Sequence, residues 1–242
     1  MTAAGTISPP LLLEGDIAAL FAQPVTVALA DPAAPQPAPF AAEACAIASA
    51  RDKRRREFLA GRAAVRAAMR RMGHPPAAVP AGKDRAPVWP SGLTGSITHS
   101  DTLCVAVLAE TAQVPALGID IEPAEPLAPD LIAEICTLSE RAWLSAQPEA
   151  VRGLLARLVF SAKECAYKCQ YALSRHMLAF HDLEITADPE TGQFEATFLR
   201  AAPCFGQGAR LYGRHLTAGG HIVTGIAARH PATTQERRLS LW

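Results

Sequence analysis

The sequence lacks a net charge and lacks a long apolar run. Its 23 Lys+Arg balance 23 Asp+Glu, and because non-specific binding to nucleic acid depends on excess cationic charge, we expect no nucleic-acid partner. No stretch of about 18 apolar residues is free of charge and proline, so we expect no membrane span. The first residues show no basic segment followed by an apolar one, as a signal peptide would. We therefore expect a reduced, cytoplasmic protein.

Cysteine pairs with metal-site spacing and glycine-rich phosphate loops are also missing. None of the six cysteines forms a C-x-x-C pair, and Cys165 and Cys169 lack two further ligands at suitable spacing. We expect the cysteines to pack as small apolar side chains. Neither G-x-x-x-x-G-K-[ST] nor G-x-G-x-x-G occurs, so a phosphate would not be held by a standard nucleotide loop.

Lysine is scarce. Lys53, Lys83, Lys163 and Lys168 are the only lysines among the 23 basic residues, and the others are arginine. Against this preference, a retained lysine suggests a position that needs a compact point charge, which arginine does not provide.

The order of the expected elements indicates an α+β fold. Half of the 242 residues are apolar, enough to bury a core without disulfides or metals. We predict strands at 24–30, 95–100, 103–110, 116–122, 183–199 (two strands) and 209–229 (a hairpin), and helices at 40–72, 130–147 and 149–173. Each half, 1–112 and 113–242, offers a long helix followed by antiparallel strands. No sequence repeat supports an internal duplication, which stays open, and we expect the polar tail to be loose.

The segment Gly118-Ile119-Asp120-Ile121-Glu122 carries the first candidate site. Because side chains alternate along a strand, Asp120 and Glu122 share one face, while Ile119 and Ile121 point into a core. Two carboxylates this close repel unless a cation lies between them. Hard oxygen ligands of this kind suit Mg²⁺ that shares its coordination sphere with substrate phosphates. The alternative is a solvated acidic edge strand.

A second candidate lies in the predicted helix FSAKECAYK at 160–168. Glu164 and Lys168 are four residues apart and share a helix face. In one interpretation they form an exposed ion pair. In the other, Glu164 is a third carboxylate for the metal and Lys168 is a cation for a phosphate. The acidic strand and the scarcity of lysine favour the second interpretation.

Two further segments offer phosphate ligands. Residues 97–100, Ile-Thr-His-Ser, place a hydroxyl and an imidazole at a strand end, although a single histidine is more often structural. In the helix 40–72, Arg51, Arg55, Arg62 and Arg66 cluster within a narrow arc, which indicates a phosphate-binding stripe or a solvated basic face.

Together these features predict Mg²⁺-dependent chemistry on a multiply phosphorylated substrate. One alternative is a Mg²⁺-dependent nuclease, but those sites usually place an acid-x-Lys pair on one strand, and here the lysine follows Glu164 by four on a helix. The other is a binding module without chemistry, in which the arginine helix recruits nucleic acid.

The motifs resemble those of Sfp-type 4′-phosphopantetheinyl transferases. GIDIE at 118–122, FSAKECAYK at 160–168, GSITHS at 95–100 and RREFLAGRAAVR at 55–66 carry the resemblance, and WPSGLTGSITHS at 89–100 is similar to the enterobactin-synthase component D branch. The resemblance implies transfer of the 4′-phosphopantetheine arm from coenzyme A to a serine of an apo acyl or peptidyl carrier protein, with release of 3′,5′-ADP. It also implies a pseudo-twofold pair of similar halves with the active site in the cleft between them.

The resemblance assigns roles to individual residues. Asp120, Glu122 and Glu164 match the ligands of a required Mg²⁺, and Glu164 is also the favoured base for the carrier serine. Lys168 matches the pyrophosphate lysine, with Lys163 as a lesser partner beside it.

The remaining assignments concern coenzyme A and the carrier. Arg54, Arg62, Lys83 and His99 match positions that hold its phosphates, and Thr98 keeps a hydroxyl where the family usually has serine. Since carrier proteins are acidic helical bundles, we expect a basic and apolar docking patch near the cleft, with the segment 124–150 and Tyr171, Leu173, Met177 and Leu178 as candidates, although core packing is the more common role of such apolar residues. Siderophore or other secondary-metabolite synthesis is the expected setting, and the two-halved fold needs no second chain, so we expect a monomer.

Overall fold

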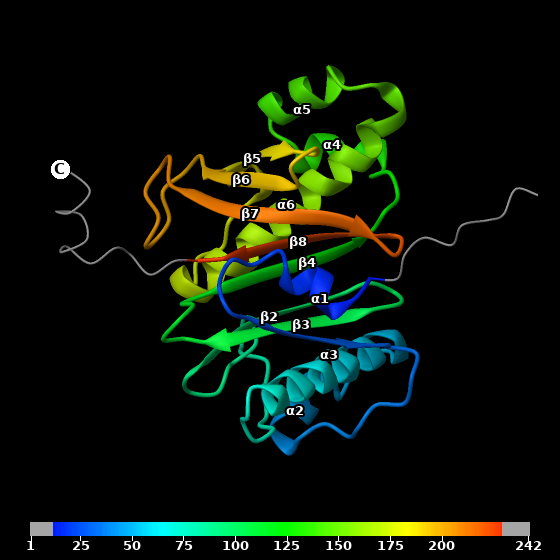
Figure 1. Ribbon diagram of the computed structural model, residues 1–242, viewed down its shortest axis with the longest axis vertical. Helices are drawn as coiled ribbons and strands as arrows, with labels where there is room; N and C mark the ends of the chain where they lie inside the picture. Colours follow the sequence, from blue (N-terminus) through cyan, green and yellow to red (C-terminus); the bar gives the residue numbers. More distant parts are fainter. Residues whose placement is uncertain (1–11, 229–242) are drawn as a thin grey trace, which may run out of the picture.

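Two antiparallel sheets lie side by side at the centre of the molecule (Figure 1). The computed structural model describes residues 12–228. A three-stranded sheet has the order β1-β3-β2, and a five-stranded sheet has the order β4-β8-β7-β6-β5. The strands are β1 (Thr26–Ala30), β2 (Leu93–His99), β3 (Cys104–Glu110), β4 (Leu117–Pro123), β5 (Leu183–Asp188), β6 (Gln193–Phe198), β7 (Arg210–Ala218) and β8 (His221–Ala227).

One long helix covers each sheet. The helices are α1 (Glu14–Ala18), α2 (Ala41–Ala44), α3 (Asp52–Arg71), α4 (Pro129–Ile135), α5 (Leu138–Ser145) and α6 (Glu149–Ser174), with short 3₁₀ turns η1 (Cys45–Ile47) and η2 (Phe180–Asp182). Helix α3 lies on the three-stranded sheet and α6 on the five-stranded one, with α4 and α5 at the far end of the latter (Figure 1). Apolar residues of α3 such as Val65 and Met69, four apart, pack against Ala106 and Leu108 of β3.

The two halves share one topology, as the predicted pseudo-twofold fold requires. In each half a strand precedes a long helix and a hairpin, and the strand orders β1-β3-β2 and β4-β8-β7 correspond. The hairpin β5–β6 is an addition at the outer edge of the second sheet. The proposed boundary after residue 112 falls in the connection between β3 and β4.

Side-chain hydroxyls join the two sheets where β2 meets β4. The backbone N–H of Ile119 donates to Ser96 Oγ at 3.2 Å, and that of Ile121 donates to Thr98 Oγ1 at 3.3 Å. Ile119 and Ile121 are buried against Val105 and Val107 in a core that the two halves share. Therefore the opposite face of β4, with its carboxylates, is directed away from this core.

Two predicted helices are interrupted. The predicted helix 40–72 is wrong between residues 48 and 51, because Arg51 takes an extended conformation as the N-cap of α3 and α2 folds back beside it. A buried ion pair, Glu43–Arg66 at 3.1 Å, holds this arrangement. The predicted helix 130–147 is two helices, because the Thr137 hydroxyl and the Glu140 carboxylate form a capping box that starts α5.

The predicted strands and the predicted helix 149–173 are confirmed, with observed bounds within a few residues of the predicted ones. The six cysteines are free, and four of them, including Cys165 and Cys169, are buried. The predicted loose tail lies outside the described residues. Among residues 12–228, no helix combines the length and apolarity needed to cross a membrane.

Candidate active site

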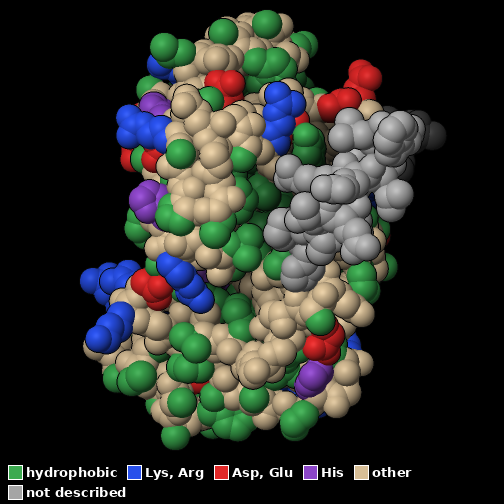
Figure 2. Space-filling view, turned by 90° about the vertical axis from the view of Figure 1, so that its left-hand side faces the viewer, with side chains coloured by type: hydrophobic (Ala, Val, Ile, Leu, Met, Phe, Trp, Pro, Cys, Tyr) green, Lys and Arg blue, Asp and Glu red, His purple; other side chains and the backbone are tan. Residues whose placement is uncertain are grey.

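A cavity of about 1140 Å³ lies between the two halves. Residues of α3, β2, β4, α6 and the loop 81–89 line it. Six of the predicted site residues are among them: Arg54, Arg62, Thr98, His99, Asp120 and Lys168. Figure 2 views the molecule from the side on which α6 ends, and lysine and arginine side chains gather there near the level where the halves meet.

Asp120 and Lys168 form the centre of the site. Lys168 Nζ lies 2.6 Å from Asp120 Oδ1, and it also donates to the Ile119 carbonyl at 3.3 Å. The Thr98 hydroxyl donates to the same Asp120 oxygen at 3.1 Å. Burial disfavours the charge on Lys168, but Asp120 outweighs this effect and raises the pKa of Lys168. The other carboxylate oxygen, Oδ2 of Asp120, is buried and has no hydrogen-bond partner among the described residues.

Two more carboxylates lie near Asp120. Burial and the charge of Asp120 raise the pKa of Glu122 to about 7, although Arg157 pairs with it at 3.0 Å. Burial also raises the pKa of Glu164, with Lys168 opposing and Asp120 adding to the shift. Burial is the largest cause of both shifts and the charge of Asp120 adds to each, so a cation near these carboxylates would be stabilised.

The donor set fits a hard divalent cation at an open site. No three His, Cys, Asp or Glu side chains of residues 12–228 are grouped closely enough to hold a metal by themselves. Mg²⁺ commonly binds to one or two carboxylates and takes its other ligands from water and substrate phosphates. The partnerless, buried Oδ2 of Asp120 is an oxygen available for such an ion.

Helix α6 presents its functional residues as one stripe. At 100° per residue, Arg157, Glu164 and Lys168 lie within about 40° of one another around the helix axis. Arg157 was missed by the sequence analysis, although its spacing of seven from Glu164 could have revealed it. The helix approaches β4 closely because position 118 is glycine, where an added Cβ would overlap the Cys165 carbonyl.

The N-terminal half contributes cations around an unexpected carboxylate. Arg54 Nη1 lies 3.1 Å from His99 Nε2. Glu57, a residue that the sequence analysis did not select, is buried and lies 3.6 Å from His99 and 3.8 Å from Arg54. Burial, with Arg54 and Lys168, lowers the pKa of His99 despite Glu57.

Arg62 is held by local contacts. Its Nε donates to the Val79 carbonyl at 2.7 Å, and its guanidinium stacks on the Phe58 ring at 4.3 Å. Burial lowers its pKa to about 10. The predicted arginine stripe is therefore not one surface, because Arg62 and Arg66 are buried whereas Arg51 and Arg55 are exposed.

A second, smaller cavity of about 270 Å³ adjoins the first. Glu57 and His99 line both cavities, so the two meet at these side chains. Glu122 lines only the smaller one, together with Lys53 and Ser100. Asp120 and Glu122 thus share a strand face, as predicted, but they border different cavities.

Four predicted ligands do not line the larger cavity: Glu122, Glu164, Lys83 and Lys163. Glu164 lines neither of the two cavities. Lys83 is exposed, although its neighbours Gly82 and Asp84 line the cavity. Lys163 requires a correction: its side chain is only 1% exposed and pairs with Glu140 at 2.8 Å on the other side of α6. At 100° per residue it lies about 120° away from the Arg157–Glu164 stripe, so it is not beside Lys168.

The candidate docking residues have different environments. Leu173 and Leu178 pack against the core of the C-terminal half, whereas Tyr171 and the exposed Met177 line the larger cavity. The segment 124–150 exposes Leu131 and Leu138, but it carries five acidic residues and one arginine.

Comparison with known proteins shows similarity to one family across both halves of the chain. The family model described as "4'-phosphopantetheinyl transferase N-terminal domain" matches residues 42–109, and the model described as "4'-phosphopantetheinyl transferase superfamily" matches residues 116–224. The 4′-phosphopantetheinyl transferase Svp of Streptomyces mobaraensis is 39% identical over 208 residues, 81% of this chain and 81% of the relative. Npt of Nocardia iowensis is 36% identical over 196 residues, 77% of this chain and 87% of the relative. Enterobactin synthase component D of Escherichia coli is 40% identical over 119 residues, 48% of this chain and 54% of the relative.

Proposed function

This chain belongs to the 4′-phosphopantetheinyl transferase superfamily, and on that premise we propose how its own residues carry out the transfer from coenzyme A to a carrier protein. The carrier serine Oγ attacks the β-phosphorus of coenzyme A and forms a new P–O bond. The P–O bond to 3′,5′-ADP breaks, and the serine proton passes to a base. One observation supports this site most directly: Lys168 pairs with Asp120 Oδ1 at the wall of the larger cavity, while Oδ2 of the same carboxylate has no hydrogen-bond partner among the described residues.

Coenzyme A occupies the larger cavity. Arg54, Arg62 and His99 supply its phosphates with charge-assisted hydrogen bonds, which are stronger than neutral ones. Lys168 faces the pyrophosphate and offsets the negative charge that develops on its oxygens during attack. Thr98 orients Asp120 through its hydroxyl. Lys83 is exposed and could reach a phosphate only from outside the cavity wall.

Asp120 would hold Mg²⁺ together with one of its neighbours Glu122 and Glu164, because no three such side chains of residues 12–228 are grouped closely enough to hold it by themselves. Water and substrate phosphates would supply the other ligands. When bound, the ion neutralises charge on the pyrophosphate. Glu164 accepts the serine proton, directly or through water. Burial raises the pKa of Glu164, which makes it a stronger base than an ordinary carboxylate. Lys163 has no part in binding phosphate in this mechanism, since its ammonium group is enclosed elsewhere.

The partner is an acyl or peptidyl carrier protein. The enterobactin synthase relatives make siderophore synthesis one candidate setting. The spacing of Glu164 and Lys168 on α6, rather than an acid-x-Lys pair on a strand, argues against a nuclease.

Intact-mass measurement of a purified apo carrier protein, after incubation with this chain, coenzyme A and Mg²⁺, tests the proposal. A gain of one phosphopantetheine arm, about 340 Da, that disappears with EDTA is the expected result. A gain that survives EDTA would remove the metal role. No gain with fatty-acid, polyketide and peptide carriers, together with no binding of coenzyme A, would contradict the proposal as a whole.

A further inference from the structure

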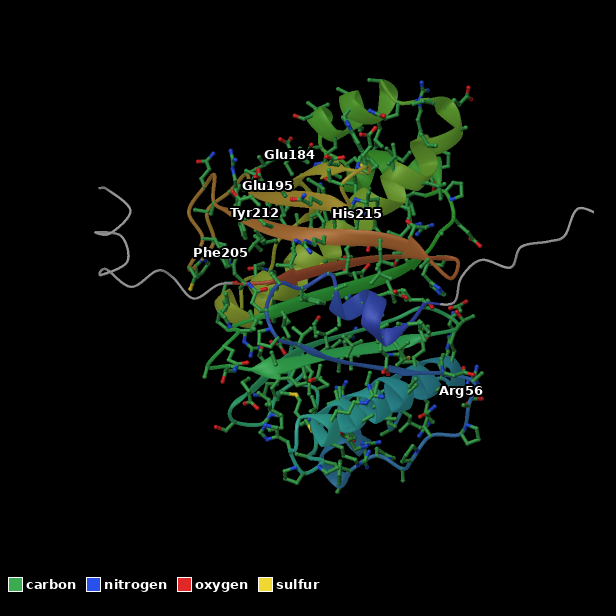
Figure 3. All side chains as sticks on the ribbon, in the orientation of Figure 1. Arg56, Glu184, Glu195, Phe205, Tyr212 and His215 are labelled. Atoms are coloured by element: carbon green, nitrogen blue, oxygen red, sulfur yellow. The ribbon has the colours of Figure 1, made fainter. Side chains whose placement is uncertain are left out.

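The first one and a half turns of α3 carry an exceptional charge. Residues 51–56 read Arg-Asp-Lys-Arg-Arg-Arg, five cations and one acid in a chain of zero net charge. All six residues are exposed. Arg56 points outwards from the end of α3 in Figure 3. We name Arg51, Lys53, Arg55 and Arg56 the α3 basic patch.

Most of this charge has no partner among residues 12–228. The guanidinium groups of Arg51, Arg55 and Arg56 make no hydrogen bond or ion pair within residues 12–228. Lys53 pairs with Asp101 at the surface, and Arg54 turns instead towards His99 in the larger cavity. The patch is therefore not explained by contacts within the fold.

The patch also opposes the electrostatics of its own helix. The N-terminus of a helix carries a partial positive charge, so acidic residues stabilise this end and basic residues destabilise it. In α3 the first turn has only Asp52 as an acid. The patch destabilises its own helix end, and its three arginines have no partner among residues 12–228. Both features point to an anionic partner, which the cations and the helix N-terminus would attract.

The α3 basic patch lies beside the two cavities of the candidate active site. Lys53 lines the smaller cavity together with Glu122, and Arg54 lines the larger one. The smaller cavity joins the larger one at Glu57 and His99. A partner held on the patch therefore faces the side of the site where Glu122 of β4 is reached without passing through the coenzyme A cavity.

We propose that the α3 basic patch is the surface on which the acidic carrier protein docks, so that its serine enters by the smaller cavity. The inference rests on the proposed function. Charge complementarity favours this surface over the segment 124–150, whose four exposed acidic residues would repel an acidic carrier. Coenzyme A is the other anion in the reaction, but none of the four patch residues lines its cavity.

The test is the double charge reversal Arg55→Glu/Arg56→Glu in the full chain. The probe is an apo carrier protein that the wild-type chain modifies, and the initial rate is measured from 25 to 400 mM NaCl. We expect kcat/KM for the carrier to fall at least tenfold at low salt and its salt dependence to flatten. We expect KM for coenzyme A to change less than twofold.

A second readout separates docking from stability. Because glutamate suits a helix N-terminus, the double variant should unfold at the same temperature as the wild type or higher. Arg70→Glu is the matched control: Arg70 is exposed at the opposite end of the same helix, and its reversal should leave kcat/KM for the carrier unchanged. A stable variant with slow carrier turnover would support docking.

Three results would overturn the inference. A higher KM for coenzyme A with unchanged carrier kinetics would assign the patch to coenzyme A. Unchanged kinetics with both substrates would make it a solvated basic face. An equal loss of kcat/KM for the carrier in Arg70→Glu would show that the effect depends on the net charge of the chain and not on the patch. If the wild-type chain modifies no carrier and binds no coenzyme A, the proposed function itself fails, which the mass measurement detects separately.

Discussion

The Tyr171 hydroxyl on α6 donates to Asp84 Oδ2 at 2.7 Å, joining the loop 81–89 of the N-terminal half to the C-terminal half. Arg175 adds to this contact: it lies 3.9 Å from the same Asp84 oxygen, and its guanidinium is 5.8 Å from the centre of the Tyr171 ring. All three residues line the larger cavity. The contact therefore closes one side of the cavity with groups from both halves.

Tyr171→Phe should loosen this closure. We expect coenzyme A to dissociate about two- to fivefold faster, with kcat for the chemical step unchanged, because an exposed contact of this kind contributes little. Stopped-flow release of a fluorescent coenzyme A analogue measures it. Tyr212→Phe, on the exposed face of β7 (Figure 3), is the control and should behave as wild type. Equal rates in all three proteins would show that the contact does not restrain the ligand.

Asp120→Asn and Glu164→Ala should each lower transfer by at least about a thousandfold while the fold is retained, since each removes charge at the reacting phosphate. In Asp120→Asn, Lys168 loses its partner, so stability should fall by about 1–3 kcal/mol. Single-turnover assays and thermal melts report both effects. A folded Glu164→Ala variant with near wild-type rate would exclude Glu164 as the base.

Lys168→Ala should lower kcat about a hundredfold and leave KM for the carrier within threefold, because in the proposed mechanism Lys168 acts on the pyrophosphate during attack rather than on the carrier. Steady-state kinetics with the carrier varied at saturating coenzyme A give both constants. An unchanged kcat with a raised carrier KM would contradict the assignment.

The pH dependence of coenzyme A binding should report on His99. Burial, helped by Arg54 and Lys168, lowers its pKa, so the neutral ring is favoured in the folded chain. Its contribution to stability is complete above the ordinary pKa of about 6.5 and is lost as the pH falls below it. A bound phosphate favours the charged ring, so we expect coenzyme A to bind roughly threefold more tightly at pH 6 than at pH 8, relative to His99→Asn.

Isothermal titration of both proteins over this pH range makes the comparison. The variant corrects for titration of the coenzyme A phosphate itself, which ionises near the same pH. Parallel pH profiles for wild type and His99→Asn would show that His99 does not gain a proton on binding.

Lys163 should matter for stability rather than for phosphate binding. Its Nζ pairs with Glu140 and donates to the carbonyls of Ile135 and Phe180, each at 2.8 Å, which ties α6 to α5, to the end of α4 and to η2. Lys163→Met leaves Glu140 buried without its cation, so unfolding free energy should fall by about 3–5 kcal/mol. Urea denaturation measures this loss, and KM for coenzyme A at low temperature should stay within twofold. A stable variant with weakened coenzyme A binding would restore the role expected from the sequence.

The sequence by itself determined the features that depend on local periodicity. Alternation along 117–123 places Asp120 and Glu122 on one face and Ile119 and Ile121 in the core, and the four-residue spacing aligns Glu164 with Lys168 on α6. Such faces follow from backbone geometry alone. The order of strands and helices likewise followed from turn residues and apolar patterns, and the missed break at Thr137 had a local capping signal.

Only the tertiary structure decided which cations line the larger cavity. Lys163 and Lys168 lie five residues apart, yet one is enclosed by α5 and η2 while the other meets Asp120. Arg66 pairs with Glu43, a residue of a helix that sequence analysis merged with its own, whereas Arg55 stays in solvent. Burial of a charge depends on which distant element packs over it and whether that element supplies a partner, and neither is encoded within one helical turn. The meeting of Asp84 with Tyr171 across the cavity has the same origin, since it needs both halves already folded against each other.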